Sequence, residues 1–436
     1  MTKGTDLWNK AKKIIPGGNQ LLSKRAEMFL PEHWPAYFEK AKGVVVTDLD
    51  GKSYIDMSIM GIGACVLGYA ESRMEKKIID AVKRGVASTF NAPEEVALAG
   101  ELIALHPWAG MARFARTGGE ANAVAVRIAR AFTKKDKVAF CGYHGWHDWY
   151  LAANLADETS LDGQLLPGLK PAGVPRALRG TSMPFTYGDL EGFKKIVAAH
   201  RDELGVVIME VARHGEPDLA FLKGVRDATH GIGAVLIYDE ISSGFRVNIG
   251  GIHMKYGLEP DMATFGKALG NGYAIAAILG RSHVMEAAQG SFISSTNWTE
   301  RIGFVAGLET IRQYKAYGVA DALVRTGLDI RKKLGVVIAR SGLDIRVIGL
   351  PSIITLVIKE QESLLIKTLI TQEMMKRGFL ASNIIYVTRA HTPRVVNSYV
   401  NALGDVLMEI AGAVKQGTAR QLLEGPVCHS GFARLN

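Results

Sequence analysis

The sequence predicts an α/β fold with a mostly parallel, buried sheet and a smaller second domain. Two apolar runs, residues 205–210 and 234–239, lack the polar and apolar alternation of a strand that faces water on one side. Such runs are typical of parallel strands that are covered on both faces. A third short apolar run follows at residues 262–265. The chain has 436 residues, which is too long for one small core, so a large domain with an appended smaller one is expected.

The first part of the chain contains two kinds of helix signal and one hairpin. Residues 1–15 have the pattern of an amphipathic helix that Pro16 stops. Residues 43–56 form two short strand patterns joined by an Asp-Gly pair, which is a strong hairpin signal. Helices are expected at 75–87 and 93–105, and the second has a proline in its first turn, where proline is favoured.

The middle and the end of the chain alternate strand and helix patterns. A strand is expected at 111–116, a helix from Thr117 to about residue 132, and a strand at 138–141. The Gly- and Pro-rich segment 157–186 is long for a connection without structure, so we interpret it as a substrate lid or a subunit contact. Residues 318–415 alternate again, with strand patterns within them, and are expected to form a C-terminal α/β domain.

Composition and charge exclude several classes of protein. Charged residues are 22% and hydrophobic residues 48% of the chain, which is ordinary for a soluble enzyme. The net charge is +9, but the basic residues are scattered among acids and form no arm or stripe, so no nucleic-acid partner is expected. No uncharged run is long enough for a membrane span. The three cysteines have no disulfide or metal spacing and the N-terminus lacks a signal-peptide core, so a cytoplasmic location is expected.

Two of the predicted strands end in residues that suit a heteroaromatic aldehyde cofactor. The run 234–239 ends in Asp239, and the run 262–265 is followed by Gly266 and Lys267. The carboxyl ends of strands line the ligand crevice of an open α/β sheet. Pyridoxal phosphate needs a carboxylate beside its ring nitrogen and an amine that forms a Schiff base with its aldehyde. We therefore expect Asp239 to hold the ring and Lys267 to hold the aldehyde.

Each of these residues also has an ordinary explanation when it is taken alone. An acid at the end of a strand is often a helix N-cap, and a lysine after a glycine commonly lies in a solvated turn. The glycines at residues 61–68 lack dinucleotide spacing, and Asp261 or Met262 stands where a P-loop needs glycine, so neither a nicotinamide site nor a P-loop is supported. The combination of acid and amine favours the cofactor.

Two further stretches suit the phosphate and the ring of the same cofactor. Gly118 and Gly119 lie between a predicted strand and a helix, an arrangement that favours an anion, although an ordinary tight turn would have the same pattern. Tyr143 follows the strand 138–141, where an aromatic ring can stack on the pyridine face. His144 and His147 have no third ligand at metal-binding spacing, so no metal is assigned.

The stretch 234–272 closely resembles the pyridoxal-phosphate signature of the class III aminotransferases, in particular their glutamate-1-semialdehyde aminomutase branch. An Asp-Glu pair, a Gly-Phe-Arg turn and a Gly-Lys-Ala-Leu-Gly run occur in this order. The resemblance implies a fold type I pyridoxal-phosphate transferase, with a large domain on a mostly parallel seven-stranded sheet and a small α/β domain built from both termini. The expected domains are 1–75, an N-terminal arm and part of the small domain, 76–315, the large cofactor-binding domain, and 316–436, the C-terminal small domain.

The resemblance also implies roles for particular residues. Gly118 and Gly119 correspond to the phosphate cup, and Tyr143 with His144 to an aromatic-His pair beside the cofactor. Glu210 corresponds to an acid near the cofactor and the substrate. Thr296 corresponds to a threonine that reaches the phosphate of the neighbouring subunit's cofactor, so a homodimer is implied. Lys24 or Arg25 is expected to bind an anionic group of the substrate, and Lys267, Asp239 and Tyr143 are the expected catalytic residues.

The implied reaction is amino transfer between a small-molecule amine donor and a keto or aldehyde acceptor. Lys267 would form the internal aldimine and then move a proton between the substrate α-carbon and the C4′ carbon of the cofactor. An intramolecular aminomutase is the alternative, although Asn383 stands where the mutases of the branch have an acid. A non-catalytic binding protein on the same fold is a third hypothesis, which a failure to bind the cofactor would favour.

Overall fold

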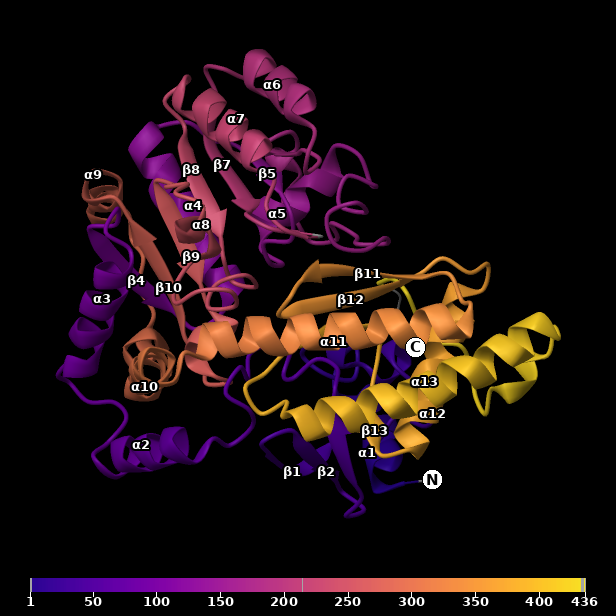
Figure 1. Cartoon of the computed structure of the whole chain (residues 1–436). Helices are drawn as coiled ribbons and strands as arrows, with labels where there is room; N and C mark the ends of the chain where they lie inside the picture. The colour runs from indigo at the N-terminus through magenta and orange to yellow at the C-terminus, as the bar shows by residue number, and fades with distance from the viewer. Residues whose placement is uncertain (1, 214, 433–434, 436) are drawn as a thin grey trace. The chain divides into compact units, whose positions relative to one another are not determined.

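The structure is a computed structural model that describes residues 2–213, 215–432 and 435. The chain divides into two compact units (Figure 1). One unit contains residues 72–320, and the other combines residues 1–71 with residues 321–436. The boundaries expected from the sequence, after residues 75 and 315, stay a prediction for the domains as folding units.

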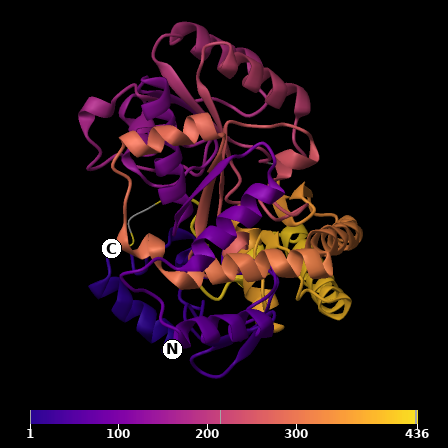
Figure 2. The ribbon, with the colours of Figure 1, turned by 90° about the vertical axis from the view of Figure 1, so that its left-hand side faces the viewer.

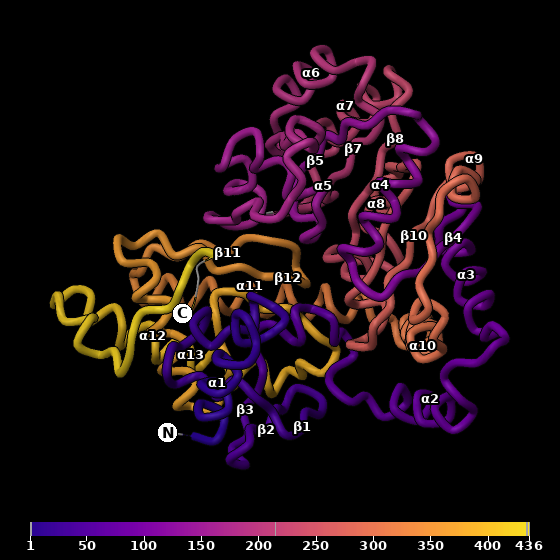
Figure 3. The backbone as a smooth tube through the Cα atoms, turned by 180° about the vertical axis from the view of Figure 1, so that it is seen from behind, coloured from indigo at the N-terminus to yellow at the C-terminus, as the bar shows by residue number. Residues whose placement is uncertain are grey.

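The unit of residues 72–320 is built on a seven-stranded sheet with the order β4-β10-β9-β8-β7-β5-β6. The strands are β4 (Met111–Ala115), β5 (Lys137–Cys141), β6 (Ser182–Pro184), β7 (Leu204–Glu210), β8 (Val235–Asp239), β9 (Met262–Phe265) and β10 (Ala276–Gly280). The labels β5, β7, β8, β10 and β4 follow one another across the view from behind (Figure 3). The strands from β6 to β9 pair in parallel, and β10 is antiparallel to both of its neighbours. The α/β class and the mostly parallel seven-stranded sheet are therefore confirmed.

Part of the segment 157–186, interpreted from the sequence as a substrate lid or a subunit contact, forms a strand that the sequence does not predict. Ser182–Pro184 is the edge strand β6, which pairs with β5, and the lid or contact role stays a prediction. Three residues are too short to produce a recognisable apolar pattern. Proline is tolerated there because an edge strand leaves one row of backbone groups unpaired.

Helices cover the sheet of this unit. They are α2 (Ser72–Lys83), α3 (Pro93–Leu105), α4 (Gly118–Thr133), α5 (Asp148–Leu151), α6 (Leu190–Ala199), α7 (Leu219–His230), α8 (Ile252–Lys255), α9 (Ser282–Met285) and α10 (Arg301–Tyr317). Thr117 caps α4 through a capping box with Glu120, which satisfies backbone amides that the helix itself cannot bind. The buried Ala, Val and Ile side chains of α4 pack against the strands, and this packing positions the start of the helix relative to the sheet.

The other unit combines segments from both ends of the chain, and Figure 2 shows indigo and yellow segments within it. Its strands are β1 (Phe38–Lys42), β2 (Val45–Asp48), β3 (Ser53–Asp56), β11 (Ile345–Leu350), β12 (Ile353–Ile358), β13 (Phe379–Leu380) and β14 (Ile384–Tyr386). Its helices are α1 (Lys3–Ile14), α11 (Val319–Ser341), α12 (Ser363–Lys376) and α13 (Pro393–Lys415). The predicted hairpin is present as β2 and β3, and β13 joins β3 in parallel across more than 300 residues of sequence.

The register of three neighbouring strands places polar side chains at one edge of the large sheet. Glu210 at the end of β7 pairs with Asp239 at the end of β8, and Asp239 pairs with Thr264 of β9. The carboxyl edge of a parallel sheet is where ligands bind in such folds. The candidate site is therefore built at this edge.

The described part of the chain contains neither a membrane-spanning helix nor a cluster of metal-ligating side chains. Over residues 2–213, 215–432 and 435, no helix is both long and apolar enough to cross a membrane. The same residues contain no group of three or more His, Cys, Asp or Glu side chains arranged to hold a metal ion.

Candidate active site

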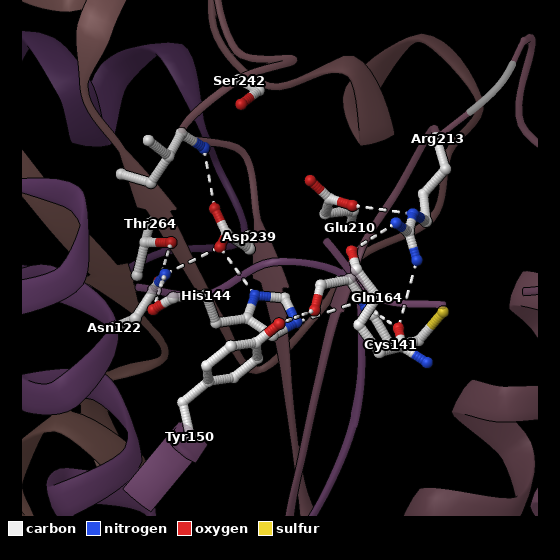
Figure 4. Close-up of polar contacts among 12 residues, drawn as sticks. Asn122, Cys141, His144, Tyr150, Gln164, Glu210, Arg213, Asp239, Ser242 and Thr264 are labelled. Atoms are coloured by element: carbon white, nitrogen blue, oxygen red, sulfur yellow. Dashed lines mark hydrogen bonds and ion pairs between the residues drawn. The ribbon is translucent and has the colours of Figure 1, made fainter. Parts of the chain in front are cut away.

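The carboxylate of Asp239 is buried and accepts three hydrogen bonds. Asp239 is only 4% exposed. Oδ2 accepts from Asn122 Nδ2 at 2.7 Å and lies 2.7 Å from His144 Nδ1, and Oδ1 accepts from the Ile241 amide at 2.9 Å. Figure 4 shows Asn122 and His144 directed at the Asp239 carboxylate. A carboxylate has about four acceptor positions, so one position remains for a ligand.

The orientation of Asn122 follows from its other contacts. Thr264 Oγ1 donates to Asn122 Oδ1 at 2.7 Å, so the amide oxygen faces Thr264 and the amide nitrogen faces Asp239. The same nitrogen is 3.2 Å from the carbonyl oxygen of His144. Asn122 therefore connects α4, β9 and the loop after β5 to one carboxylate.

The contacts of His144 determine which of its ring nitrogens carry protons. Nδ1 faces Asp239, and Nε2 is 3.2 Å from the carbonyl oxygen of Cys141. A carbonyl oxygen can only accept a hydrogen bond, and so can an ionised carboxylate. With Asp239 ionised, the His144 ring satisfies both contacts by donating from both nitrogens, which makes it a cation that balances the buried charge.

Lys267 lies where the sequence predicts, directly after β9, and its backbone is strained. Its φ angle is 42°, in the left-handed region that non-glycine residues avoid at a cost of about 1–3 kcal/mol. The amine Nζ donates to Ser242 Oγ at 2.6 Å. Strain of this kind is concentrated at active sites, so the backbone supports the position of Lys267 independently of its chemistry.

The predicted phosphate cup is a place where two loops approach closely. A Cβ atom on Gly145 would lie 2.8 Å from the Cα of Gly119, and one on Gly118 would lie 2.8 Å from Ile241 Cγ2. No described residue accepts a hydrogen bond from the amides of Gly118 and Gly119. His147 Nδ1, which would lie 3.1 Å from a Cβ on Gly119, is buried without a partner among the described residues. These donors at the start of α4 suit an anion.

Tyr143 lies at the exposed edge of the site. It is 41% exposed, and its ring meets that of Tyr150 edge to face with centroids 5.9 Å apart. Burial of the hydroxyl and, second, the negative charge of Asp239 raise the pKa of Tyr143. The preceding residue, Gly142, is fixed because its carbonyl accepts a hydrogen bond from Tyr150 Oη at 3.0 Å.

Glu210 stands beside Asp239 but has a different partner. Its carboxylate Oε2 is 3.1 Å from Arg213 Nε. Burial raises the pKa of Glu210, whereas the charge of Arg213 acts in the opposite direction. Two neighbouring carboxylates repel each other, and each of them here faces a cationic group of its own.

A buried network on the other side of β8 holds the loop that follows Asp239. Glu240 is fully buried and accepts from Ser243 Oγ, from the Ile252 and His253 amides and from His253 Nδ1, at 2.7–3.0 Å. Burial alone would raise the pKa of Glu240, but the His253 hydrogen bond and the other donors leave it below its ordinary value. Trp108 donates to His253 Nε2 at 2.9 Å, so His253 is neutral.

Thr296 is exposed, on a turn that Arg116 holds. Arg116 Nε donates to the Asn297 carbonyl at 2.6 Å, and Nη2 donates to the carbonyls of Trp298 and Glu300. An ion pair of 3.6 Å links Arg116 to Glu300. Because Arg116 directly precedes Thr117, it connects this turn to the phosphate cup.

Lys24 and Arg25 belong to the other unit. Lys24 ends a short 3₁₀ turn and is exposed. Arg25 is half-buried, with its guanidinium 5.7 Å from the centroid of the Phe432 ring. Their expected role in substrate binding stays a prediction.

The residues of the larger unit fit pyridoxal phosphate. Asp239 keeps one acceptor position for a protonated ring nitrogen, and the amides of Gly118 and Gly119 with His147 Nδ1 supply donors for a phosphate. Lys267 supplies an amine from the turn that follows the neighbouring strand β9. Sequence reasoning missed Asn122, Ser242, Gln164 and Arg213, because contacts between distant segments leave no periodic signal; only the Thr117 capping pattern pointed to the start of α4.

Comparisons with known proteins show which family this chain belongs to. A family model described as aminotransferase class-III matches residues 30–394. The 3-aminobutyryl-CoA aminotransferase of Cloacimonas acidaminovorans (strain Evry) is 30% identical over 425 residues, which cover 94% of this chain and 98% of that protein. The glutamate-1-semialdehyde 2,1-aminomutase of Methanococcoides burtonii is 32% identical over 363 residues, or 81% of this chain and 83% of that protein.

A solved structure supports the fold. The PLP internal aldimine form of the FumI protein of Sphingopyxis sp. MTA144 superposes with a TM-score of 0.86. The superposition covers 95% of this chain and 98% of that protein, and the two sequences are 24% identical. At this identity the likeness concerns the fold alone.

The substitution Gly145→Ala tests the cup. The alanine Cβ would press on Gly119, and the φ of 110° at this position is unfavourable for alanine. We therefore expect pyridoxal phosphate to bind about tenfold more weakly or worse. Gly188→Ala is the control, because Gly188 also has a positive φ but open space around it. Absorbance titration with the cofactor measures the affinity. Equal affinities in the two variants would contradict the cup.

A second prediction concerns pH. His106 donates from Nδ1 to the Leu102 carbonyl and accepts from the Gly251 amide at Nε2, and burial lowers its pKa from 6.5 to about 4. Between these two pH values the unfolded chain binds a proton that the folded chain does not, so stability falls as the pH drops from 6.5 towards 4. Melting temperatures across this range should fall less steeply in His106→Gln, and the exposed control His283→Gln should match the wild type. An unchanged slope in His106→Gln would contradict the assignment.

Proposed function

The chain belongs to the class III aminotransferases, which are pyridoxal-phosphate enzymes, and from this premise we propose how its own residues carry amino transfer. The donor is a small-molecule amine and the acceptor is a keto or aldehyde compound. The observation that carries the proposal is the placement of two residues at one edge of the sheet. Asp239, a buried carboxylate with one acceptor position left, ends β8, and the strained Lys267 follows two residues after the end of the adjacent strand β9.

The proposed roles divide among four groups of residues. The bound cofactor would supply the electron sink that stabilises negative charge on the substrate carbon. Asp239, held by Asn122 and His144, binds the ring nitrogen and keeps it protonated. Lys267 Nζ would hold the cofactor through its aldehyde and, once the donor amine has displaced it, would accept the proton from the donor's α-carbon as a free amine. Gly118 and Gly119 bind the phosphate through their amides, together with the His147 ring.

Tyr143 and Ser242 complete this site in the proposal. Tyr143 lies on the loop after β5 and stacks on the pyridine face. Ser242 Oγ receives the Lys267 amine when that amine is not bonded to the cofactor, which keeps the amine beside the place where the proton moves. His144 belongs to the site through its contact with Asp239 and binds no cofactor atom in this proposal.

An aminomutase is the second candidate, because a glutamate-1-semialdehyde 2,1-aminomutase is among the relatives. A mutase uses the same residues and differs in retaining its intermediate, so that one substrate is rearranged without an acceptor. The presence of Asn383 where the branch's mutases have an acid favours the transaminase. Lys24, Arg25 and Glu210 remain proposed substrate contacts. A non-catalytic protein of the same fold is disfavoured by the joint presence of Asp239 and Lys267.

The spectrum of the purified protein with pyridoxal phosphate tests the function. A visible band of the bound cofactor should appear, and an amine donor such as L-glutamate or a 3-amino acid should convert it to the band of the aminated cofactor. A keto acid should then restore the first band. Conversion of one substrate into its isomer without an acceptor would identify the mutase instead.

Two controls separate the possible outcomes of this test. Lys267→Ala should lose the wild-type band and at least about 10²–10⁴-fold in rate. Lys223→Ala removes a lysine that is exposed on α7 and should behave as the wild type. A wild-type protein that takes up no cofactor would refute the function.

We also propose a homodimer in the cytoplasm. Phe90 and Phe292 are both 87% exposed and Val96 is 76% exposed, and large exposed apolar side chains are typical of an interface. Thr296 lies on the same exposed turn region as Phe292 and would reach the partner's phosphate. Cys65, Cys141 and Cys428 are buried and form no disulfide, which suits a reducing compartment.

Sedimentation analysis tests the homodimer. The wild type should sediment as a dimer at micromolar concentration, and Phe292→Asp should shift it towards the monomer, since a charge in an apolar interface is costly. Thr296→Ala should remain a dimer and bind the cofactor more weakly. A monomeric wild type with full activity would contradict both the dimer and the role of Thr296.

A further inference from the structure

Arg213 contacts Glu210 and Gln164 at the edge of the site, and Arg213 itself is not one of the expected catalytic residues. Nε pairs with Glu210 Oε2 at 3.1 Å. Nη1 donates to Gln164 Oε1 at 3.1 Å, and Nη2 donates to the Gln164 carbonyl at 2.6 Å. Figure 4 shows the guanidinium between the two residues. The Arg213 side chain is 12% exposed, so these contacts are largely shielded from water.

Gln164 carries the contact onward to the backbone of the site. It is 6% exposed, and it comes from the long segment 157–186. Its Oε1 also accepts from the Gly142 amide at 2.8 Å, and its Nε2 donates to the Phe185 carbonyl at 3.2 Å. Gln164 thus joins this segment to the loop that carries Tyr143, and Arg213 joins Gln164 to Glu210.

Gly142 is held from three directions. Its amide binds Gln164, its carbonyl binds Tyr150, and a Cβ at this position would lie 2.5 Å from Glu210 Oε2. Its φ of 121° is one that residues other than glycine rarely adopt. Because Tyr143 follows directly, the direction of its ring depends on this peptide unit.

We propose that Arg213 is a positioning residue for amino transfer, which keeps Glu210 as a carboxylate beside Asp239 and, through Gln164, fixes the backbone on which Tyr143 is mounted. The effect on catalysis rests on the proposed function. The contacts of Arg213 and Gln164 are independent of that function, because they are made between residues of this chain alone.

The charges around Glu210 explain why it needs a cation. The ionisable groups that face it come from several elements: Cys141 from β5, His144 from the loop after β5, Tyr150 from α5, Asp239 from β8, Lys267 after β9, and Arg213 itself. Burial raises the pKa of Glu210 and Asp239 raises it further, whereas Arg213 opposes both most strongly. Without Arg213 the pKa of Glu210 rises, so the carboxylate takes up a proton at a higher pH.

Amide hydrogen exchange in the folded protein tests whether Arg213 holds the segment 157–186 in place. In Arg213→Gln the amides of Gln164 and Leu165, which both bond to the Leu161 carbonyl, should exchange about tenfold faster, because charged hydrogen bonds that stabilise the closed segment are lost. Lys170→Gln is the matched control. Lys170 lies on the same segment, is exposed and makes one long ion pair of 3.5 Å, so its loss should leave the exchange rate unchanged.

The pH profile of kcat/KM tests the electrostatic part, and two variants separate the parts. Arg213→Lys keeps the charge but lacks the planar fork that reaches both partners. The acid limb of the kcat/KM profile of Arg213→Lys should match that of the wild type. The amides of Gln164 and Leu165 should nevertheless exchange faster than in the wild type. Gln164→Ala should likewise loosen the segment without moving the acid limb. Arg213→Gln should do both, with the acid limb moved to higher pH.

The outcomes that overturn the proposal are distinct from failure of the proposed function. Wild-type exchange in Arg213→Gln would show that Arg213 does not hold the segment. An acid limb that moves equally in Arg213→Lys and Arg213→Gln would exclude the charge as its cause. A wild type that binds no cofactor would refute the proposed function, and the exchange rates would still decide whether Arg213 fixes the segment.

Discussion

The site depends on the cost of burying one negative charge. An ionised carboxylate removed from water is strongly unfavourable unless it is paired and hydrogen-bonded. Asp239 meets this condition with donors from Asn122 on α4, His144 after β5 and the Ile241 amide after β8. These partners come from three different segments, so the strand order and the start of α4 must both be correct before the charge is satisfied. The fold and the chemistry are coupled through this carboxylate.

The neighbouring acids are kept apart by strand geometry and by separate partners. Asp239 and Glu240 are consecutive, and successive side chains near the end of a strand point to opposite sides. One therefore faces the candidate site and the other faces His253 in a buried network. Glu210 lies beside Asp239 in the adjacent strand, and Arg213 balances it. Each carboxylate has its own donors, which lowers the cost of placing three acids within one small region.

Much of the fold and the two central site residues could be predicted from the sequence. The apolar runs that end in Asp239 and precede Lys267 carry a strong strand signal, and their place at strand ends follows from it. The edge strand β6 was missed because three residues carry no pattern. Asn122, Gln164 and Arg213 could not be predicted. Asn122 lies 117 residues from Asp239 and Arg213 lies 49 residues from Gln164 in the sequence, and such pairings follow from packing. The left-handed backbone at Lys267 has no sequence signal either.

The protonation state of the cofactor ring nitrogen tests the central claim most directly. Nuclear magnetic resonance of the holoenzyme with ¹⁵N-labelled pyridoxal phosphate reports this state through the nitrogen chemical shift. We expect a protonated ring nitrogen in the wild type, which becomes unprotonated in Asp239→Asn. An unprotonated nitrogen in the wild type, or a signal that Asp239→Asn leaves unchanged, would contradict the claim that the buried carboxylate organises this site.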